Sequence, residues 1–346
     1  MMSSVENKPV VHVLTMGGTI AGVAESAVSA SYQAGARPGA DLLASIPGLE
    51  NLADVHVQDV VAKDSSDLEL FDWTQLLHAV EKAVQREQVA GVVITHGTDT
   101  MEETAFFLSL LLRSDKPVIL VGAMRPATAL SADGPLNLYN AIAVAVDPAS
   151  RCRGVQIVMN DRIMPARRVT KGHTTAVESF AMPGHGGFGA GDGTVTMGLV
   201  KYFETPCTQG LPEDIQLTWP SSEGTVTYPR VDILYQHVGM MVPEIEQFLG
   251  GGPNLLRGLV IAGTGAGNVA ACLKPLIDGL RAKDVVIVRS TRVWAGGVID
   301  DYQRLDSEWG LVGAGELSAH KARTLLMLLL RQGYGLDDVR RCFKRF

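Results

Sequence analysis

Short apolar runs alternate with longer segments in which apolar positions recur every three or four residues. The short runs are rich in β-branched residues and do not alternate with polar ones, which is typical of strands buried on both faces. In the first half of the chain they predict strands at Val10–Thr15, Val55–Val61, Val89–Thr95, Pro117–Val121 and Gly154–Met159, with helices at Trp73–Arg86 and Met101–Arg113. This order of elements indicates βαβ units, and hence a mostly parallel sheet covered by helices.

A second series of strands and helices follows a stretch rich in Pro, Thr and Ser. That stretch, residues 209–229, is typical of a linker between domains. Beyond it the pattern predicts strands at Val231–Tyr235, Leu259–Ala262 and Val285–Arg289, with helices at Val269–Ala282 and Ser318–Gln332. We therefore predict an α/β fold with two α/β domains, a larger N-terminal one at residues 1–208 and a smaller C-terminal one at residues 230–346.

The composition narrows the class of protein. With 346 residues, 46% of them hydrophobic, the chain is long enough for two cores. The net charge of −7, without a basic stripe that carries interleaved aromatic residues, argues against a nucleic-acid partner. The longest apolar runs, such as Leu325–Leu330, are too short to span a membrane. The polar N-terminal residues show no secretory signal as written, so we expect a cytoplasmic protein, or a periplasmic one if a signal was removed.

Several common kinds of site are missing from the sequence. The four cysteines are far apart without a C-x-x-C pair, and the eight histidines show no ligand spacing, so we expect neither a metal site nor a disulfide scaffold. There is no P-loop motif and no G-x-S-x-G motif of a serine hydrolase. Gly263–Asn268 follows a predicted strand but lacks the third glycine of a dinucleotide fingerprint, which leaves nucleotide binding as a distant alternative.

Hydroxyl side chains follow three of the predicted strands. Thr19 comes after the first strand, Ser65 and Ser66 after the second, and Thr98 with Asp99 after the third. Because parallel strands end at the same edge of a sheet, these side chains can converge on one pocket. A hydroxyl becomes a good nucleophile only when a base removes its proton.

No histidine is suitably placed to act as that base. The remaining candidates are Tyr32, in a segment of small residues that could form a lid, and Lys171, for which a solvated surface position is the simpler interpretation. Thr100 and Glu103 have the spacing of a capping box at the start of the predicted helix that follows the third strand. The preceding Thr98 and Asp99 therefore belong either to a well-capped turn or to a functional site.

Five groups of motifs, in the same order along the chain, resemble the bacterial type II L-asparaginases. The first two are the most specific. The motifs are MGGTIAG at Met16–Gly22, ITHGTDTMEETAFFL at Ile94–Leu108, GAMRP at Gly122–Pro126 with SADGPLNLYNA at Ser131–Ala141, VTKGHT at Val169–Thr174, and VRSTRV at Val288–Val293 with LSAHKAR at Leu317–Arg323.

The resemblance implies an activity and an assembly. The reaction would be hydrolysis of the side-chain amide of L-asparagine to L-aspartate and ammonia, without a metal or a cofactor. L-glutamine could be a second substrate. The fold would comprise a larger N-terminal and a smaller C-terminal α/β domain. The protein would be a homotetramer built as a dimer of intimate dimers.

The resemblance also implies roles for individual residues. Thr19 matches the nucleophile, Tyr32 matches a lid tyrosine that hydrogen-bonds it, and Thr98, Asp99 and Lys171 match a second catalytic group. In that group the lysine, held by the aspartate, makes the threonine or its bound water basic. The implied substrate-binding residues are Ser65, Ser66, Thr98, Asp99, Ala123, Asn268 and Gln303.

One position departs from the family pattern. The family has a glutamate that reaches the substrate's α-amino group from the neighbouring subunit, beside an asparagine that matches Asn268. Counting without gaps from Val288–Val293, that glutamate position falls on Gln303, although Asp300, Asp301 or Asp306 could substitute for it. We expect weaker binding of the substrate as a result.

Two other functions remain as alternatives. An asparaginase-like subunit of a tRNA-dependent amidotransferase would share the fold, but the expected additional N-terminal domain is missing from the sequence as written. A catalytically silent amino-acid-binding protein would keep the substrate-binding residues and lose the catalytic hydroxyls. Here all five matches to catalytic residues are present, which favours an enzyme.

Overall fold

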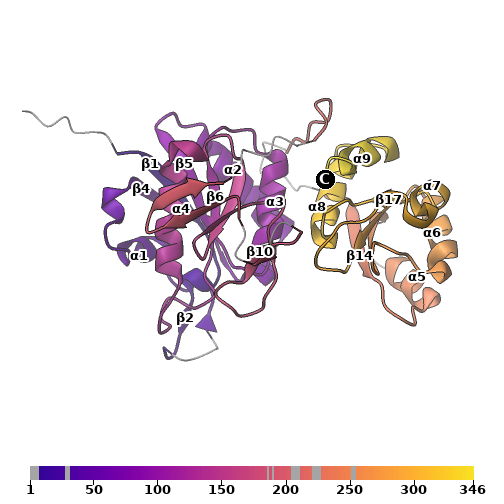
Figure 1. Ribbon diagram of the computed structural model, residues 1–346, viewed down its shortest axis with the longest axis horizontal. Coiled ribbons are helices and arrows are strands. Elements are labelled where there is room, and N and C mark those ends of the chain that lie inside the picture. Colours follow the sequence, from indigo (N-terminus) through magenta and orange to yellow (C-terminus); the bar gives the residue numbers. More distant parts are fainter. Residues whose placement is uncertain are drawn as a thin grey trace, which may run out of the picture. The chain divides into compact units, whose positions relative to one another are not determined.

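The computed structural model of the chain divides into two compact units, Met1–Cys207 and Thr208–Phe346 (Figure 1). It describes residues 8–27, 32–184, 187–188, 191–203, 211–219, 227–250 and 255–346. Each unit has its own sheet with helices packed on it, so the predicted pair of α/β domains is confirmed. Part of the predicted linker at 209–229 lies outside the described residues.

The larger unit is built on one mixed sheet. Over the described residues this sheet has eight strands in the order β13-β12-β8-β7-β6-β5-β1-β4. The five strands from β4 to β7 run parallel, and the remaining three are antiparallel to their neighbours. Their bounds are β1 Val10–Gly17, β4 Asp54–Lys63, β5 Val89–Thr95, β6 Val118–Val121, β7 Val155–Met159, β8 Arg162–Pro165, β12 Gly193–Thr196 and β13 Leu199–Tyr202.

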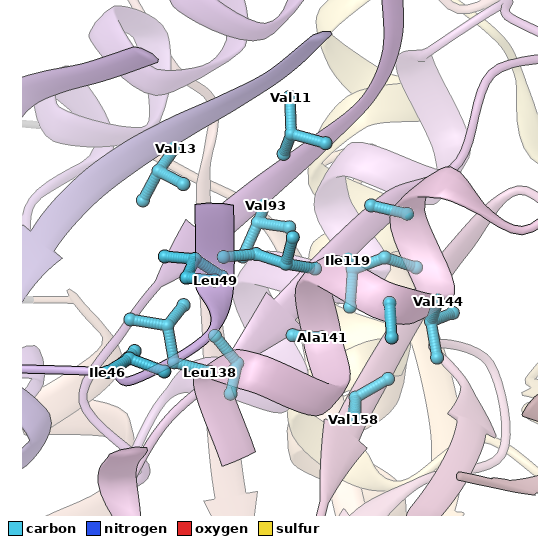
Figure 2. Packing of buried hydrophobic residues seen from close by; sticks show 14 of the residues in the cluster. Val11, Val13, Ile46, Leu49, Val93, Ile119, Leu138, Ala141, Val144 and Val158 are labelled. Carbon is cyan, nitrogen blue, oxygen red and sulfur yellow. The ribbon is translucent and has the colours of Figure 1, made fainter. Parts of the chain in front are cut away.

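Four α-helices of the larger unit pack against this sheet: α1 (Gly39–Ala44), α2 (Leu70–Val84), α3 (Met101–Leu111) and α4 (Gly134–Val146). Side chains of α1 and α4 form one apolar core with alternate residues of the central strands, and Figure 2 shows this core, with Val11, Val13 and Val93 from the strands and Leu138 and Ala141 from α4. Away from this cluster, Trp73 of α2 stacks on Phe107 of α3 with ring centroids 4.6 Å apart.

Shorter elements lie beside the large sheet. The strands β2 (Val23–Ala24) and β3 (Tyr32–Gln33) form a two-stranded ribbon, and β9 (Thr170–Lys171), β10 (Phe180–Met182) and β11 (Gly187–Phe188) form a separate three-stranded sheet with β9 at its edge. Single 3-10 turns occur at η1 Thr19–Ala21, η2 Leu49–Asn51, η3 Ser65–Asp67 and η4 Pro148–Ser150.

In its described residues, the smaller unit has a four-stranded, fully parallel sheet in the order β14-β15-β16-β17. Its central strands β15 and β16 are buried, and the helix α8 packs on β14, β15 and β16. The bounds are β14 Arg230–Tyr235, β15 Leu256–Gly263, β16 Val286–Thr291, β17 Val312–Gly313, α5 Val242–Gly250, α6 Lys274–Arg281, α7 Leu305–Glu308, α8 Ala319–Arg331 and α9 Leu336–Phe343, with 3-10 turns at η5 Ala271–Leu273 and η6 Tyr302–Arg304.

One predicted helix begins later than expected. The prediction was Val269–Ala282, whereas α6 starts at Lys274 with Pro275 in its first turn. Before it, Thr264 and Asn268 exchange two backbone hydrogen bonds that close a tight glycine-rich turn. Proline favours the first turn of a helix, so the helix begins there rather than at Val269. In the part of the chain that the structure describes, no helix is long and apolar enough to cross a membrane.

Candidate active site

The carboxyl ends of three neighbouring strands meet because two glycines allow their backbones to touch. β1 lies between β4 and β5, with Gly17 opposite Lys63 and Thr15 opposite Thr95. Gly18 has a φ of +78°, and a Cβ on it would lie 2.4 Å from the backbone of Gly97. Only glycine permits both that conformation and that approach. The segment carrying Thr19 is therefore held directly against the turn carrying Thr98.

The second glycine brings the end of β4 into the same place. A Cβ on Gly97 would lie 2.6 Å from Oγ of Ser65, so the Ser65 side chain packs against this turn. The Thr100 hydroxyl donates to the backbone carbonyl of Ser65 at 2.8 Å and makes no side-chain cap to α3. The predicted capping box is therefore wrong, although Thr100 is the N-cap residue. Its hydroxyl joins the two strand ends instead of closing the helix.

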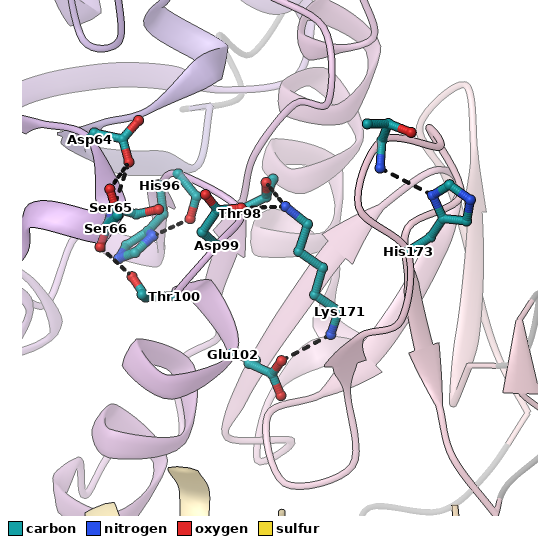
Figure 3. A network of polar contacts seen from close by, with 12 residues as sticks. Asp64, Ser65, Ser66, His96, Thr98, Asp99, Thr100, Glu102, Lys171 and His173 are labelled. Atoms are coloured by element: carbon teal, nitrogen blue, oxygen red, sulfur yellow. Dashed lines mark hydrogen bonds and ion pairs between the residues drawn. The ribbon is translucent and has the colours of Figure 1, made fainter. Parts of the chain in front are cut away.

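Lys171 reaches the same turn from the edge strand β9. Its Nζ donates to Oγ1 of Thr98 at 2.8 Å and to Oδ1 of Asp99 at 2.5 Å (Figure 3). The lysine side chain is 14% exposed and the aspartate side chain 62%. A solvated surface position for Lys171 is therefore excluded, because its ammonium is directed at the hydroxyl of Thr98.

These residues surround one cavity of about 490 Å³, which is open to solvent. Thr19 and Ser65 are both buried, at 7% and 3% exposure. The structure thus brings together Thr19, Ser65, Thr98, Asp99 and Lys171, which the sequence placed in one site. Among the described residues, the lining comprises Thr19, Ala27, Asp64, Ser65, Gly97, Thr98, Asp99, Met124, Arg125, Pro126, Ala129, Leu130, Lys171, Thr174 and Thr175.

Three residues of the predicted site lie elsewhere or are not fully described. Ser66 is exposed, and its backbone N–H and hydroxyl both donate to the carboxylate of Asp64. Ala123 is completely buried and is not among the described lining residues, whereas the adjacent Met124 is. The backbone of Tyr32 pairs with Ala24 in the ribbon, whereas its side chain lies outside the described part of the structure.

Asn268 and Gln303 belong to the smaller unit. The Oδ1 atom of Asn268 is buried and has no hydrogen-bond partner within the described residues. Gln303 is exposed, at φ 56° and ψ 26°.

Two of the three aspartates considered as substitutes for the family's glutamate are already engaged nearby. The Asp306 carboxylate accepts two hydrogen bonds from the fully buried Arg289, each at 2.5 Å. The Asp301 carboxylate accepts from the backbone N–H groups of Asp306 and Ser307, and these bonds lower the pKa of Asp301, with the bond from Ser307 the largest cause. The third aspartate, Asp300, is exposed, as is Gln303.

His96 is fully buried beneath the site. Its Nδ1–H donates to the carbonyl of Gly97 at 2.7 Å, which helps to fix the turn. Burial lowers the pKa of His96 from 6.5 to about 4, because a charged imidazolium loses its hydration there. The ring is therefore neutral at physiological pH, and its place behind the cavity lining makes it part of the scaffold.

Two residues close to this site were not predicted from the sequence. Arg125 lines the cavity mouth, where its guanidinium donates to the Ser131 carbonyl. Glu102, the second residue of α3, is 5% exposed, and its Oε1 accepts hydrogen bonds from Lys171 N and Thr170 Oγ1. The indication for Glu102 was a carboxylate in a mostly apolar helix, although the adjacent Glu103 shares this feature. Within the described residues, no group of His, Cys, Asp and Glu side chains is arranged to hold a metal ion.

The geometry agrees with comparisons with known proteins. A model of the family described as "Asparaginase, N-terminal" matches residues 10–201, and one described as "Glutaminase/Asparaginase C-terminal domain" matches residues 230–343. The chain belongs to the asparaginase family. Among relatives in this family it is 39% identical over 341 residues to a probable periplasmic L-asparaginase of Haemophilus influenzae, a match that covers 98% of the chain and 93% of the relative.

Other asparaginases give the same result. The chain is 36% identical over 341 residues to L-asparaginase 2 of Escherichia coli, covering 98% of the chain and 93% of the relative. It is 37% identical over 336 residues to a glutaminase-asparaginase of Acinetobacter glutaminasificans, covering 96% and 98%. The crystal structure of a probable cytoplasmic L-asparaginase from Campylobacter jejuni superimposes with a TM-score of 0.88 at 36% identity, over 99% of the chain and 100% of that protein. The predicted family and the predicted enzyme class are confirmed, and neither alternative function is favoured.

Proposed function

We propose that this asparaginase uses Thr19 as the nucleophile: its hydroxyl attacks the side-chain amide of L-asparagine and ammonia leaves, and a water then hydrolyses the resulting ester, which releases L-aspartate and restores the hydroxyl. The observation that carries the proposal is the pair of bonds from Lys171 to Thr98 and Asp99, at 2.8 and 2.5 Å, beside the cavity that Thr19 also lines. A lysine that has given up a proton can accept one from the Thr98 hydroxyl or from a water bound to it.

The amide carbon becomes tetrahedral during the reaction, and its oxygen acquires negative charge. Backbone N–H groups of the turn around Gly97 and Thr98 are the donors that we assign to this oxyanion, because those of Met124 and Arg125, which follow Ala123, already donate to Asp133. The departing nitrogen needs a proton, for which the Lys171 ammonium is the nearest donor to Thr98 in the described site.

The charged end of the amino acid requires polar partners. We assign Ser65 to the α-carboxylate and Asp99 to the α-ammonium, because one offers a hydroxyl donor and the other a carboxylate acceptor at the same cavity. Asn268 and Gln303 of a neighbouring subunit would complete this end of the site, and Tyr32 would cover Thr19. Ser66 remains a candidate for substrate binding only because it is adjacent to Ser65.

A direct test is the release of ammonia by the purified protein from L-asparagine, L-glutamine and D-asparagine. We expect turnover of L-asparagine, slower turnover of L-glutamine, and an unchanged rate after treatment with EDTA. No ammonia from any of the three amides would contradict the proposed function. A complete loss of activity with EDTA that added metal reverses would contradict the cofactor-free mechanism.

We further propose a homotetramer, built as a dimer of dimers, that works in the cytoplasm. Cys152 and Cys272 are exposed free thiols, which fits a reducing compartment. Sedimentation should give a mass about four times the 36.9 kDa of one chain. A mass near that of one chain, or recovery of the protein in the periplasmic fraction of its host, would contradict the corresponding part of this proposal.

A further inference from the structure

The strand that carries Lys171 does not belong to the large sheet that carries the other residues of the site. β9 contains only Thr170 and Lys171 and pairs with β10, with Lys171 opposite Phe180. The three-stranded sheet to which it belongs shares no strand with the eight-stranded sheet. The pairing of strands therefore sets the position of Lys171 relative to β10, but not relative to Thr98.

The Glu102 carboxylate joins the backbone of this edge strand to the helix that follows the catalytic turn. Glu102 Oε1 accepts a hydrogen bond from the backbone N–H of Lys171 at 3.0 Å and another from the Thr170 hydroxyl at 2.8 Å. Glu102 lies three residues after Asp99, in the first turn of the helix that follows the Thr98 turn. Figure 3 shows the result, with Lys171 held by its backbone at Glu102 and by its ammonium at Thr98 and Asp99.

We propose that Glu102 is a positioning residue, which sets the distance between the Lys171 amine and the Thr98 hydroxyl. This inference rests on the proposed function. A carboxylate suits the task because it can accept an N–H and an O–H bond on one oxygen and because such bonds to a charged acceptor are short and strong. Its burial keeps water from competing for the Lys171 N–H.

The position of Lys171 matters more for turnover than for binding. Proton transfer to a base depends steeply on distance, and a displacement of about 1 Å can lower a rate by about 10². The α-carboxylate of the substrate is assigned to Ser65 and its α-ammonium to Asp99, which Lys171 contacts only through its ammonium. Loss of the Glu102 bonds should therefore lower kcat by a larger factor than it raises KM.

Three variants separate positioning from a general structural role. Glu102→Leu removes both bonds, Glu102→Gln keeps an oxygen acceptor without the charge, and Thr170→Val removes one of the two bonds. Glu103→Gln, a change of the neighbouring and more exposed carboxylate, is the matched control. We expect kcat on L-asparagine to fall by about 10-fold to 10² in Glu102→Leu, with partial rescue in Glu102→Gln, a smaller loss in Thr170→Val and none in the control.

A crystal structure of Glu102→Leu gives a readout that does not depend on turnover. We expect the distance from Lys171 Nζ to Thr98 Oγ1 to exceed that of a hydrogen bond. A folded Glu102→Leu that keeps this distance, or that keeps kcat within about threefold of the unchanged protein, would overturn the inference. If Glu102→Leu does not fold, equal kcat values for Thr170→Val, Glu102→Gln and the unchanged protein would overturn it. Absence of ammonia release by the unchanged protein would count against the proposed function, whereas the crystallographic distance would still decide the role of Glu102.

Discussion

At the scale of single residues, the site depends as much on two glycines, which have no side chain, as on the reactive residues. Gly18 and Gly97 let the ends of β1, β4 and β5 approach to contact distance, and any Cβ at either position would strike backbone or Ser65. The sequence identified the hydroxyls because they follow strands, and the resemblance supplied their roles. It could not show that the Thr100 hydroxyl bonds Ser65, because a local spacing rule takes no account of a partner 35 residues away.

The two threonines can be tested individually. Thr19→Val and Thr98→Val should each lower kcat by a factor of about 10³ or more, because each removes a hydroxyl assigned to the chemistry. Thr19→Ser and Thr98→Ser keep the hydroxyl and serve as matched controls, with much smaller losses expected. Thermal unfolding should be similar in all four variants. Near-normal turnover in either valine variant would show that its hydroxyl has no catalytic role.

Gln303 offers a test of substrate affinity. A carboxylate in place of this amide would restore a charged partner for the α-ammonium, a difference of about 1–2 kcal/mol. Gln303→Glu should therefore lower KM for L-asparagine several-fold, with a smaller change in kcat. Both side chains can occupy the φ of 56° at this position with similar strain, so the backbone should not change.

Asp300 is the control for this experiment, since Asp301 and Asp306 are engaged with backbone N–H groups and with Arg289. An unchanged KM in Gln303→Glu, together with a raised KM in Asp300→Asn, would mean that Asp300 already supplies the charge. An unchanged KM in both variants would mean that this loop is not part of the binding site.

At the scale of elements, the central strands of both sheets were predictable and the small sheet was not. β1, β4, β5, β6 and β7 lie within two residues of their predicted bounds. Four of them are largely apolar runs between polar turns, whereas the edge strand β4, with the sequence DVHVQDVVAK, was recognised by its β-branched valines. α4 was missed because its AIAVAV segment is apolar on all sides and shows no helical stripe. β9, with two residues, shows no periodicity at all. The position of Lys171 thus depends on Glu102, a long-range contact that no local pattern reports.

The turn after β5 should make the protein sensitive to acid through His96. The folded-state pKa of about 4 lies below the unfolded value of 6.5, so the unfolded chain binds the extra proton first as the pH falls. This contribution to stability is complete above pH 6.5 and is lost between about pH 6.5 and 4, up to about 3 kcal/mol. Differential scanning calorimetry across this range should show a falling Tm.

His96→Gln is the matched variant, because glutamine can still donate to the Gly97 carbonyl but does not titrate. Its Tm should fall less steeply over the same range than that of the unchanged protein. Parallel curves for the two proteins would mean that carboxylates, and not His96, account for the loss of stability in acid.

At the scale of the whole molecule, the residues assigned to the substrate come from two separate units. The cavity is lined by residues between Thr19 and Thr175, all in the larger unit, whereas Asn268 and Gln303 are in the smaller one. The division into two α/β units followed from two series of apolar runs in the sequence. The assembly of several chains could not be predicted from hydrophobic periodicity, because an interface depends on the protein surface. Only the resemblance to the family indicated that one subunit completes the site of another.

Mixing of two inactive variants can test this shared site. Thr98→Val disables the catalytic turn, and Asn268→Ala removes the amide whose buried Oδ1 has no partner within the described residues. If each site combines the catalytic turn of one subunit with Asn268 of its neighbour, a mixed dimer has one site with both defects and one site with none. After the two variants are unfolded and refolded together, half of the dimers should be mixed, so about a quarter of the unchanged protein's activity should return.

Differently tagged chains on a native gel would confirm that mixed oligomers have formed. Either variant refolded alone is the control and should stay nearly inactive. If one chain supplied the whole site, every site in a mixed oligomer would carry one defect or the other, and no activity would return. Recovery of activity would therefore establish that the smaller unit of one subunit serves the catalytic turn of its neighbour, because no arrangement within a single chain can produce an intact site from these two variants.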